Sequence, residues 1–257
     1  MTVAIDVPDG GPLFEGHFPG RPILAGIAEL ALVADALAPG SPVGEIPYVR
    51  FRGLVRPGDR LTVTPARGED GVTRFDVRRG DERIASGEFR YGAPGATLDA
   101  SSAVAARRAP DVPGLETLIP HRPPMRFVDR VLGEAEDGLT CLARIPRACA
   151  LVENGSVRSF VALEAAAQAA AVWEALRRSR SGGAFEARIG YLVSIRDAVL
   201  HCATLPADEP FTVSVRLEAA AGALADYAVE AVIDGAVALR GRIGTYADGQ
   251  SSRNTNH

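Results

Sequence analysis

The sequence predicts an α+β protein built from two tandem repeats, each a long helix followed by an antiparallel sheet that wraps it. An alanine-rich segment with a helical period occurs once in each half of the chain, and strand-like segments with matching turns follow it. A stretch rich in alanine, serine, proline and glycine separates the halves. The same order of elements occurring twice indicates an internal duplication.

The domain boundaries follow from changes in composition along the chain. We expect the first half in residues 1–93, a linker in residues 94–113, the second half in residues 114–247 and a disordered tail in residues 248–257. The linker has no sustained apolar period, and the tail is polar throughout. The two halves are then of roughly similar size.

The helix of the first half is expected within residues 23–40, ended by Pro39 and Gly40. The apolar stripe of this helix carries Ile27, Leu30, Ala31, Ala34 and Leu37. Residues 73–92 then alternate in polarity around a turn at Gly80, which predicts a β-hairpin.

The second half repeats this pattern, with its helix expected within residues 156–183. The apolar stripe carries Phe160, Leu163, Ala167, Ala170 and Ala171. Residues 227–246 form the matching hairpin, with its turn at Asp234-Gly235. Small alanine side chains on a buried face let a sheet approach each helix closely, which favours a long helix wrapped by a curved sheet.

The overall composition excludes several classes of function. A net charge of -4 over 257 residues leaves no basic excess for nucleic-acid binding. No apolar run reaches the roughly 18 residues of a membrane span, and no signal peptide precedes the first motif. The three cysteines lack CxxC spacing and are expected to be free thiols. We therefore expect a cytoplasmic protein.

The most informative motif is FEGHFPGRPILAG, residues 14–26. Its prolines and glycines form a turn that holds His17 next to Phe18, just before the first helix. The unpaired N–H groups at the start of that helix, near Ala25 and Gly26, can polarise a carbonyl and hold an enolate oxygen. We expect His17 to act as a base there, with Phe18, Ala25 and Gly26 contacting the substrate. A purely structural loop histidine is the alternative.

This segment resembles the hotdog-fold 3-hydroxyacyl-[acyl carrier protein] dehydratases, whose pattern is GHFPGxPxxPG before a central helix. Ala25 stands where the second proline of that pattern belongs. Ala31 stands where the family's helix carries a catalytic glutamate. Glu29 is two positions away, a rotation of about 200° along a helix. We therefore expect Glu29 to face away from the site.

The second half carries the opposite combination. Its lead-in, LIPHRPPMRFVDRV in residues 118–131, resembles the N-terminal part of the same dehydratases, and ALEAAAQ around Glu164 resembles their acid-bearing helix. Gly155-Ser156 stand where the histidine belongs, and we expect His121 of the lead-in to be structural. Glu164 borders the apolar face of its helix, so burial should raise its pKa and keep it protonated as a general acid.

The two defects cancel if the halves pair as the resembled dehydratase subunits do, with joined sheets and antiparallel helices. One interface site then receives His17 and Glu164, whereas the other receives Ser156 and Ala31 and has neither group. The resemblance is to the paired dehydratase-like subunits of aryl-polyene-type gene clusters, here fused into a pseudo-dimer. We expect a tandem, or double, hotdog fold with one active site.

The resemblance implies a dehydratase that converts 3-hydroxyacyl thioesters to trans-2-enoyl thioesters in a fatty-acid, polyketide or aryl-polyene-like pathway. The substrate would be carried on phosphopantetheine, by acyl carrier protein or coenzyme A, with no further cofactor and no metal. Arg21 and Arg158 are expected near the entrance, where they could meet an acidic carrier protein. Two alternatives remain open: acyl-thioester hydrolysis on the same fold, and a non-catalytic, carrier-binding partner of another dehydratase. Further assembly into a homo-oligomer also remains open.

Overall fold

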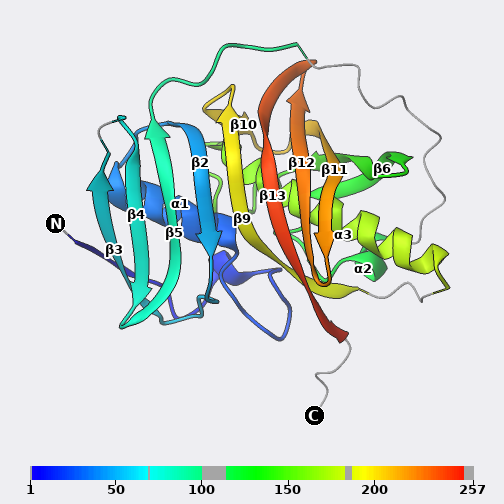
Figure 1. Cartoon of the computed structure of the whole chain (residues 1–257), viewed down its shortest axis with the longest axis horizontal. Coiled ribbons are helices and arrows are strands. Elements are labelled where there is room, and N and C mark those ends of the chain that lie inside the picture. Colours follow the sequence, from blue (N-terminus) through cyan, green and yellow to red (C-terminus); the bar gives the residue numbers. More distant parts are fainter. Residues whose placement is uncertain (1, 69, 100–113, 183–186, 252–257) are drawn as a thin grey trace.

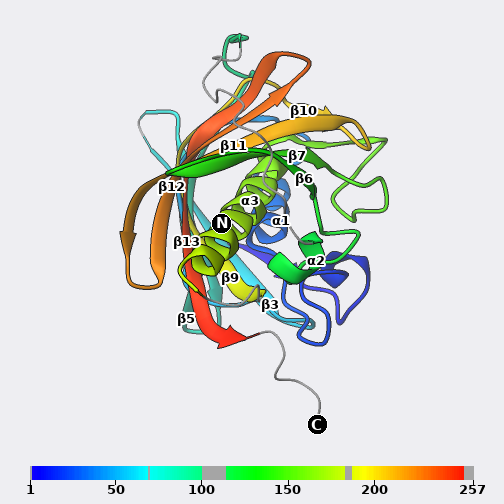
Figure 2. The ribbon, with the colours of Figure 1, turned by 90° about the vertical axis from the view of Figure 1, so that its right-hand side faces the viewer.

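The computed structural model describes residues 2–68, 70–99, 114–182 and 187–251. They form an eleven-stranded antiparallel sheet, ordered β1-β3-β4-β5-β2-β9-β13-β12-β11-β7-β6, that curls around the helices α1 and α3 (Figures 1 and 2). Within the described ranges, no helix combines the length and the apolarity needed to cross a membrane.

The first half consists of one long helix and five strands. Its elements are β1 (Val3–Asp6), η1 (Pro12–Phe14), α1 (Gly26–Leu37), β2 (Val43–Phe51), β3 (Arg60–Arg67), β4 (Thr73–Arg79) and β5 (Glu82–Tyr91). The helix lies where the sequence predicts it, and β4 and β5 form the predicted hairpin around Gly80. Gly80 has a φ of 58°, a conformation in which glycine has no steric cost.

The second half repeats this order with further strands before its long helix, and β8 pairs with β10 in a small separate sheet. Its elements are α2 (Leu115–Leu118), β6 (Val128–Ala135), β7 (Gly138–Arg144), β8 (Ser156–Arg158), η2 (Ser159–Val161), α3 (Ala162–Arg180), β9 (Arg188–Leu200), β10 (Thr204–Pro206), β11 (Pro210–Ala221), β12 (Leu224–Ile233) and β13 (Ala236–Ser251). The hairpin β12–β13 turns at Asp234 and Gly235, both with positive φ, as a type I′ turn requires.

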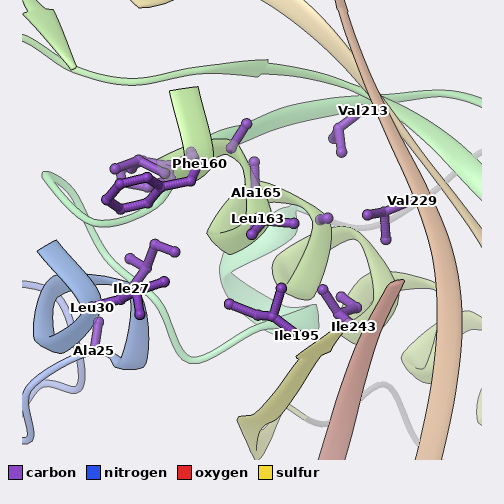
Figure 3. Packing of buried hydrophobic residues seen from close by; sticks show 14 of the residues in the cluster. Ala25, Ile27, Leu30, Phe160, Leu163, Ala165, Ile195, Val213, Val229 and Ile243 are labelled. Carbon is purple, nitrogen blue, oxygen red and sulfur yellow. The ribbon is translucent and has the colours of Figure 1, made fainter. Parts of the chain in front are cut away.

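The halves join through the strand that follows the long helix in each of them. Strand β2 pairs antiparallel with β9, with Val49 opposite Ile195. One large buried cluster contains apolar side chains from both halves, and Figure 3 shows Ile27, Leu30 and Phe160 among those that fill the space between the helices. The fold is therefore the predicted tandem hotdog, with the two halves paired as a pseudo-dimer.

Two boundaries differ from the predictions because non-local strand pairing sets them. Residues 156–158, predicted as the start of the second helix, form strand β8 against β10. Strand β13 runs to Ser251, opposite Arg188, so the expected tail starts later than residue 248. The remaining tail, residues 252–257, lies outside the described residues.

The first part of the expected linker lies against the second half. The Gly95 N–H donates to the Leu200 carbonyl (2.8 Å), and the Val237 N–H donates to the Leu98 carbonyl (2.9 Å). Residues 100–113 lie outside the described residues. The described part of the linker therefore extends the contact between the halves.

Candidate active site

His17 is held in the turn before α1 by contacts with the second half. The Arg122 N–H donates to the Gly16 carbonyl (3.1 Å), and a side chain at Gly16 would meet the Arg122 carbonyl at 2.0 Å. His17 Nδ1 lies 3.3 Å from the Ile23 carbonyl oxygen, which can only accept, so Nδ1 carries the hydrogen. The lone pair of the ring is therefore on Nε2, the nitrogen available as a base.

Glu164 is held in the first turn of α3 by two hydrogen-bonding side chains. His121 Nε2 and Gln168 Nε2 each lie 3.2 Å from Glu164 Oε1. Gln168 is fixed in turn, because it donates to the Met125 carbonyl (2.7 Å) and accepts from the Phe127 N–H (2.8 Å). The lead-in of the second half thus orients the carboxylate.

The structure brings His17 and Glu164 together, as predicted, and adds His121. One side-chain atom of each residue lies within 4.8 Å of the others, and all three residues are buried. The rings of His17 and His121 have centroids 5.2 Å apart. The expectation that His121 is merely structural missed this contact with Glu164. The sequence signal was the histidine in the PHR motif of the lead-in.

These three side chains are also the donor set that a divalent ion would require. Two histidines and one glutamate form the protein ligands of a common class of zinc site. The expectation that no metal takes part therefore stays a prediction, which activity in the presence of a chelator tests. Glu164 Oε1 already has two hydrogen-bonding partners, so the cluster is also complete as a proton-transfer site without an ion.

A long pocket opens from this cluster along α3. Together with its open mouth it encloses about 970 Å³. Glu164, Ala167, Ala171 and Arg178 line one side of it, which corresponds to about 21 Å along the helix. Residues of β9 and β13, including Tyr246, also line the pocket. The pocket therefore has the length and the apolar character that an extended acyl chain requires.

Gly26 is the predicted substrate-binding residue that the structure places in this pocket. It is the first residue of α1, and within the described residues no backbone carbonyl accepts a hydrogen bond from its N–H. The Phe51 ring lies 3.3 Å from where a side chain at this position would begin, so glycine leaves room for both the ring and a ligand. The free N–H can bind a carbonyl oxygen.

Phe18 and Ala25 do not line the pocket, contrary to prediction. The Phe18 ring packs with Ile23 and Ile189 in a small separate cluster. Ala25 is fully buried and caps α1 with its carbonyl, which accepts from the Glu29 N–H (2.9 Å). Both residues shape the turn behind the site.

The two arginines expected at the entrance lie in different places. Arg21 is exposed, and it is close enough to the pocket residue Tyr191 to oppose the rise in the Tyr191 pKa that burial causes. Arg158 is absent from the pocket lining and forms an ion pair with Asp35 of α1. Asp35 lies one turn beyond Ala31 and Arg158 lies two residues after Ser156, so the pair occupies the region of the degenerate second site.

The protonation state of Glu164 differs from the one expected, whereas that of His17 suits the expected base. Burial lowers the pKa of His17 to about 4, despite the opposing charge of Glu164, so the imidazole is neutral at neutral pH. Burial alone would raise the pKa of Glu164. The hydrogen bond from His121, the electrostatic interactions with both histidines and the hydrogen bond from Gln168 together outweigh burial and lower it to about 2. Glu164 is thus a carboxylate, not the protonated acid that the sequence predicts.

Glu29 also differs from its prediction, because it lines the pocket. It is 3% exposed, and among the described residues no partner hydrogen-bonds its Oε1 atom. Burial raises its pKa to about 8, so it is largely protonated at neutral pH. Gly26 and Glu29 are about one helical turn apart and lie on the same side of α1, and this side faces the pocket.

Substituting Glu29→Gln is expected to stabilise the protein at alkaline pH. The pKa of Glu29 is higher in the folded protein than in the unfolded chain, so the contribution of its neutral carboxyl to the free energy of unfolding is complete below about pH 4.5. That contribution is lost as the pH rises to about 8. The difference in unfolding free energy should grow with pH towards an upper limit of about 5 kcal/mol. Urea unfolding of both proteins between pH 5 and 8.5 measures it, and a pH-independent difference would contradict the assignment.

The duplicated helix-and-sheet unit, with one His–Glu site between its copies, defines the double-hotdog class of dehydratase folds. Residues 113–255 match the ApeP-like family, described as ApeP dehydratase, and the chain belongs to this family. Residues 1–88 match the ApeI-like family, described as ApeI dehydratase. The predicted fusion of two dehydratase-like subunits is confirmed.

Curated relatives match shorter parts of the chain. A 3-hydroxyacyl-[acyl-carrier-protein] dehydratase FabZ from Oenococcus oeni is 38% identical over 65 residues, covering 20% of this chain and 44% of the relative. The FabZ of Syntrophomonas wolfei is 27% identical over 95 residues, covering 31% of this chain and 66% of the relative. The chain thus spans from under half to about two thirds of the length of these relatives.

Solved structures share the fold at low sequence identity. A dehydratase domain of a trans-AT polyketide synthase from Brevibacillus brevis has a TM-score of 0.73 and 9% identity, covering 97% of this chain and 94% of that one. The dehydratase heterocomplex ApeI:P from Xenorhabdus doucetiae has a TM-score of 0.50 and 21% identity over 54% of this chain and 93% of that one. These likenesses support the double-hotdog architecture.

Proposed function

We propose that the protein is a 3-hydroxyacyl-thioester dehydratase that forms trans-2-enoyl thioesters in a fatty-acid, polyketide or aryl-polyene-like pathway. The observation that carries the proposal is the meeting of His17 and Glu164, from opposite halves, at one long apolar pocket. Membership of a dehydratase family supports the same reaction class. The catalytic residues would be His17 and Glu164, with Gly26 binding the thioester oxygen.

The reaction begins at C2 of the substrate. The Gly26 N–H binds the thioester oxygen and stabilises the negative charge that develops on it. His17 is neutral and presents Nε2, so it can take the C2 proton and become an imidazolium. The Glu164 carboxylate stabilises this cation, because opposite charges attract strongly in a buried site.

The proton returns to the substrate when the C3–oxygen bond breaks. Glu164 accepts a hydrogen bond from the 3-hydroxyl and so places it beside the imidazolium. The hydroxyl leaves with the proton that His17 carries, and the electrons of the C2–H bond become the new double bond. The products are the enoyl thioester and water, with His17 neutral and Glu164 ionised as at the start. No metal ion takes part.

The substrate would arrive on the phosphopantetheine arm of an acyl carrier protein. The names of the curated relatives specify acyl-carrier-protein substrates. Arg21 is exposed near Tyr191, and we assign it to contact with the acidic carrier. Arg158 is no longer a candidate for this contact, because it pairs with Asp35.

Incubating the protein with a 3-hydroxyacyl thioester is expected to give enoyl absorbance without release of free thiol. Parallel reactions with carrier-bound and coenzyme A-bound substrate identify the preferred carrier, and a reaction with a metal chelator should proceed at the same rate. Release of free thiol would assign the protein as a hydrolase. If neither product forms, the protein is a non-catalytic carrier-binding partner.

A further inference from the structure

The side chain of Glu29 is a polar group in the acyl pocket for which the proposed reaction has no role. It is 3% exposed, and its Oε1 atom has no hydrogen-bond partner among the described residues. A buried polar atom without a partner is destabilising, so a protein tends to retain one where a ligand completes its hydrogen bonding. The position of Glu29 on the pocket wall makes a bound molecule that partner.

The location of Glu29 limits which part of the substrate it can reach. Glu29 lies three residues after Gly26 on the same side of α1, an axial distance of about 4.5 Å. Helix side chains lean towards the N-terminus, which brings the carboxyl group closer to the thioester position at Gly26. Glu29 therefore lies beside the substrate atoms next to the reacting carbons.

The neighbouring pocket wall is apolar. Ile23, Leu24, Phe51 and Leu54 are among the residues that line the pocket, the Phe51 ring lies beside Gly26, and Gly26 presents only backbone. A carboxyl group in such surroundings is held in its neutral form by burial. A neutral carboxyl both donates and accepts a hydrogen bond, so it suits a hydroxyl or a carbonyl oxygen rather than a cation.

We propose that Glu29 is a specificity-determining residue that hydrogen-bonds an oxygen atom on the acyl chain just beyond C3. The inference rests on the proposed function in that it takes the pocket to hold an acyl thioester. The amide oxygens of the phosphopantetheine arm offer the same chemistry. We assign the acyl chain because Glu29 is almost fully buried, whereas the arm must extend to solvent. The enzyme would therefore prefer chains with a further hydroxyl or keto group over plain alkyl chains.

Equilibrium binding of unreactive analogues tests this assignment without requiring turnover. The ligands are 3-hydroxyacyl pantetheine analogues in which an amide nitrogen replaces the thioester sulfur. All have the same chain length. One has only carbon and hydrogen beyond C3, and the others carry one hydroxyl at successive carbons beyond C3. Wild-type protein should bind one of the hydroxylated ligands about 10-fold more tightly than the all-carbon ligand. Glu29→Leu should abolish this preference, and Glu29→Gln, which keeps a donor and an acceptor, should retain most of it.

Two matched controls make the result specific. Glu153→Gln changes an exposed carboxyl that is absent from the pocket lining, and it should leave the preference intact. Analogues that replace pantetheine with a simple alkyl amine distinguish the two sources of oxygen. If Glu29→Leu weakens only pantetheine-bearing ligands, by the same factor for both chains, the partner is the arm and the inference is wrong. It is also wrong if Glu29→Leu keeps the wild-type preference, or if no analogue binds.

The binding experiment also separates this inference from the proposed reaction. A protein that prefers the hydroxylated analogue but forms no enoyl product would retain the Glu29 assignment and lose the dehydratase assignment. A protein that dehydrates both chains equally, and binds both analogues equally in wild-type and Glu29→Leu forms, would retain the reaction and lose the Glu29 assignment.

Discussion

Replacing His17 with glutamine is expected to lower kcat for dehydration by about 10³-fold or more, while substrate-analogue binding changes little. The imidazole is the neutral base of the site, with Nδ1 engaged at the Ile23 carbonyl and Nε2 free to take a proton. Glutamine keeps a polar side chain of similar length but cannot accept the C2 proton at neutral pH. The loss should therefore fall on the chemical step.

His201→Gln is the matched control for this variant. His201 is partly exposed, is absent from the pocket lining and contacts the Ala96 carbonyl (2.7 Å). Its substitution should leave kcat within about twofold of wild type, as for an ordinary surface change. Retention of near wild-type kcat in His17→Gln would transfer the role of base to His121, the other imidazole of the cluster.

The sequence predicted the pairing of His17 with Glu164 because the two halves carry complementary defects. The first half keeps the histidine and has Ala31 at the acid position, and the second keeps Glu164 and has Ser156 at the histidine position. The repeat and the way in which such halves pair are sufficient to predict one complete site. The β2–β9 junction then puts both groups at one crevice.

The residues that the sequence did not reveal depend on contacts between distant segments. His121 is 43 positions from Glu164, and only the path of the lead-in brings its Nε2 to 3.2 Å. Missing that hydrogen bond reversed the predicted direction of the Glu164 pKa shift. The contact between Gln168 and Glu164 could have been predicted from the sequence, because the two residues are one helical turn apart. Glu29 was misplaced because its side of α1 was judged from Ala31, which is absent from the pocket lining, and not from Gly26, one helical turn before it.

Replacing Glu164 with glutamine is expected to lower kcat by about 10²-fold or more, even though the amide can still contact His121 and Gln168. The substitution removes the negative charge that stabilises the imidazolium of His17. Glu153→Gln, an exposed change on the loop before β8, is the control and should keep wild-type activity.

The pH dependence of kcat/KM distinguishes a carboxylate at Glu164 from a protonated acid. With the pKa of His17 at about 4 and that of Glu164 at about 2, wild-type activity should fall only as pH drops below about 5, when His17 gains its proton. Removing the charge of Glu164 lowers the pKa of His17 further, so the acid limb of Glu164→Gln should move to lower pH. A protonated Glu164 would instead give wild-type activity that declines as pH rises through neutrality, and a decline that disappears in Glu164→Gln would restore its role as a general acid. Measuring both proteins with an all-carbon substrate reduces the influence of Glu29 ionisation near pH 8 on the comparison.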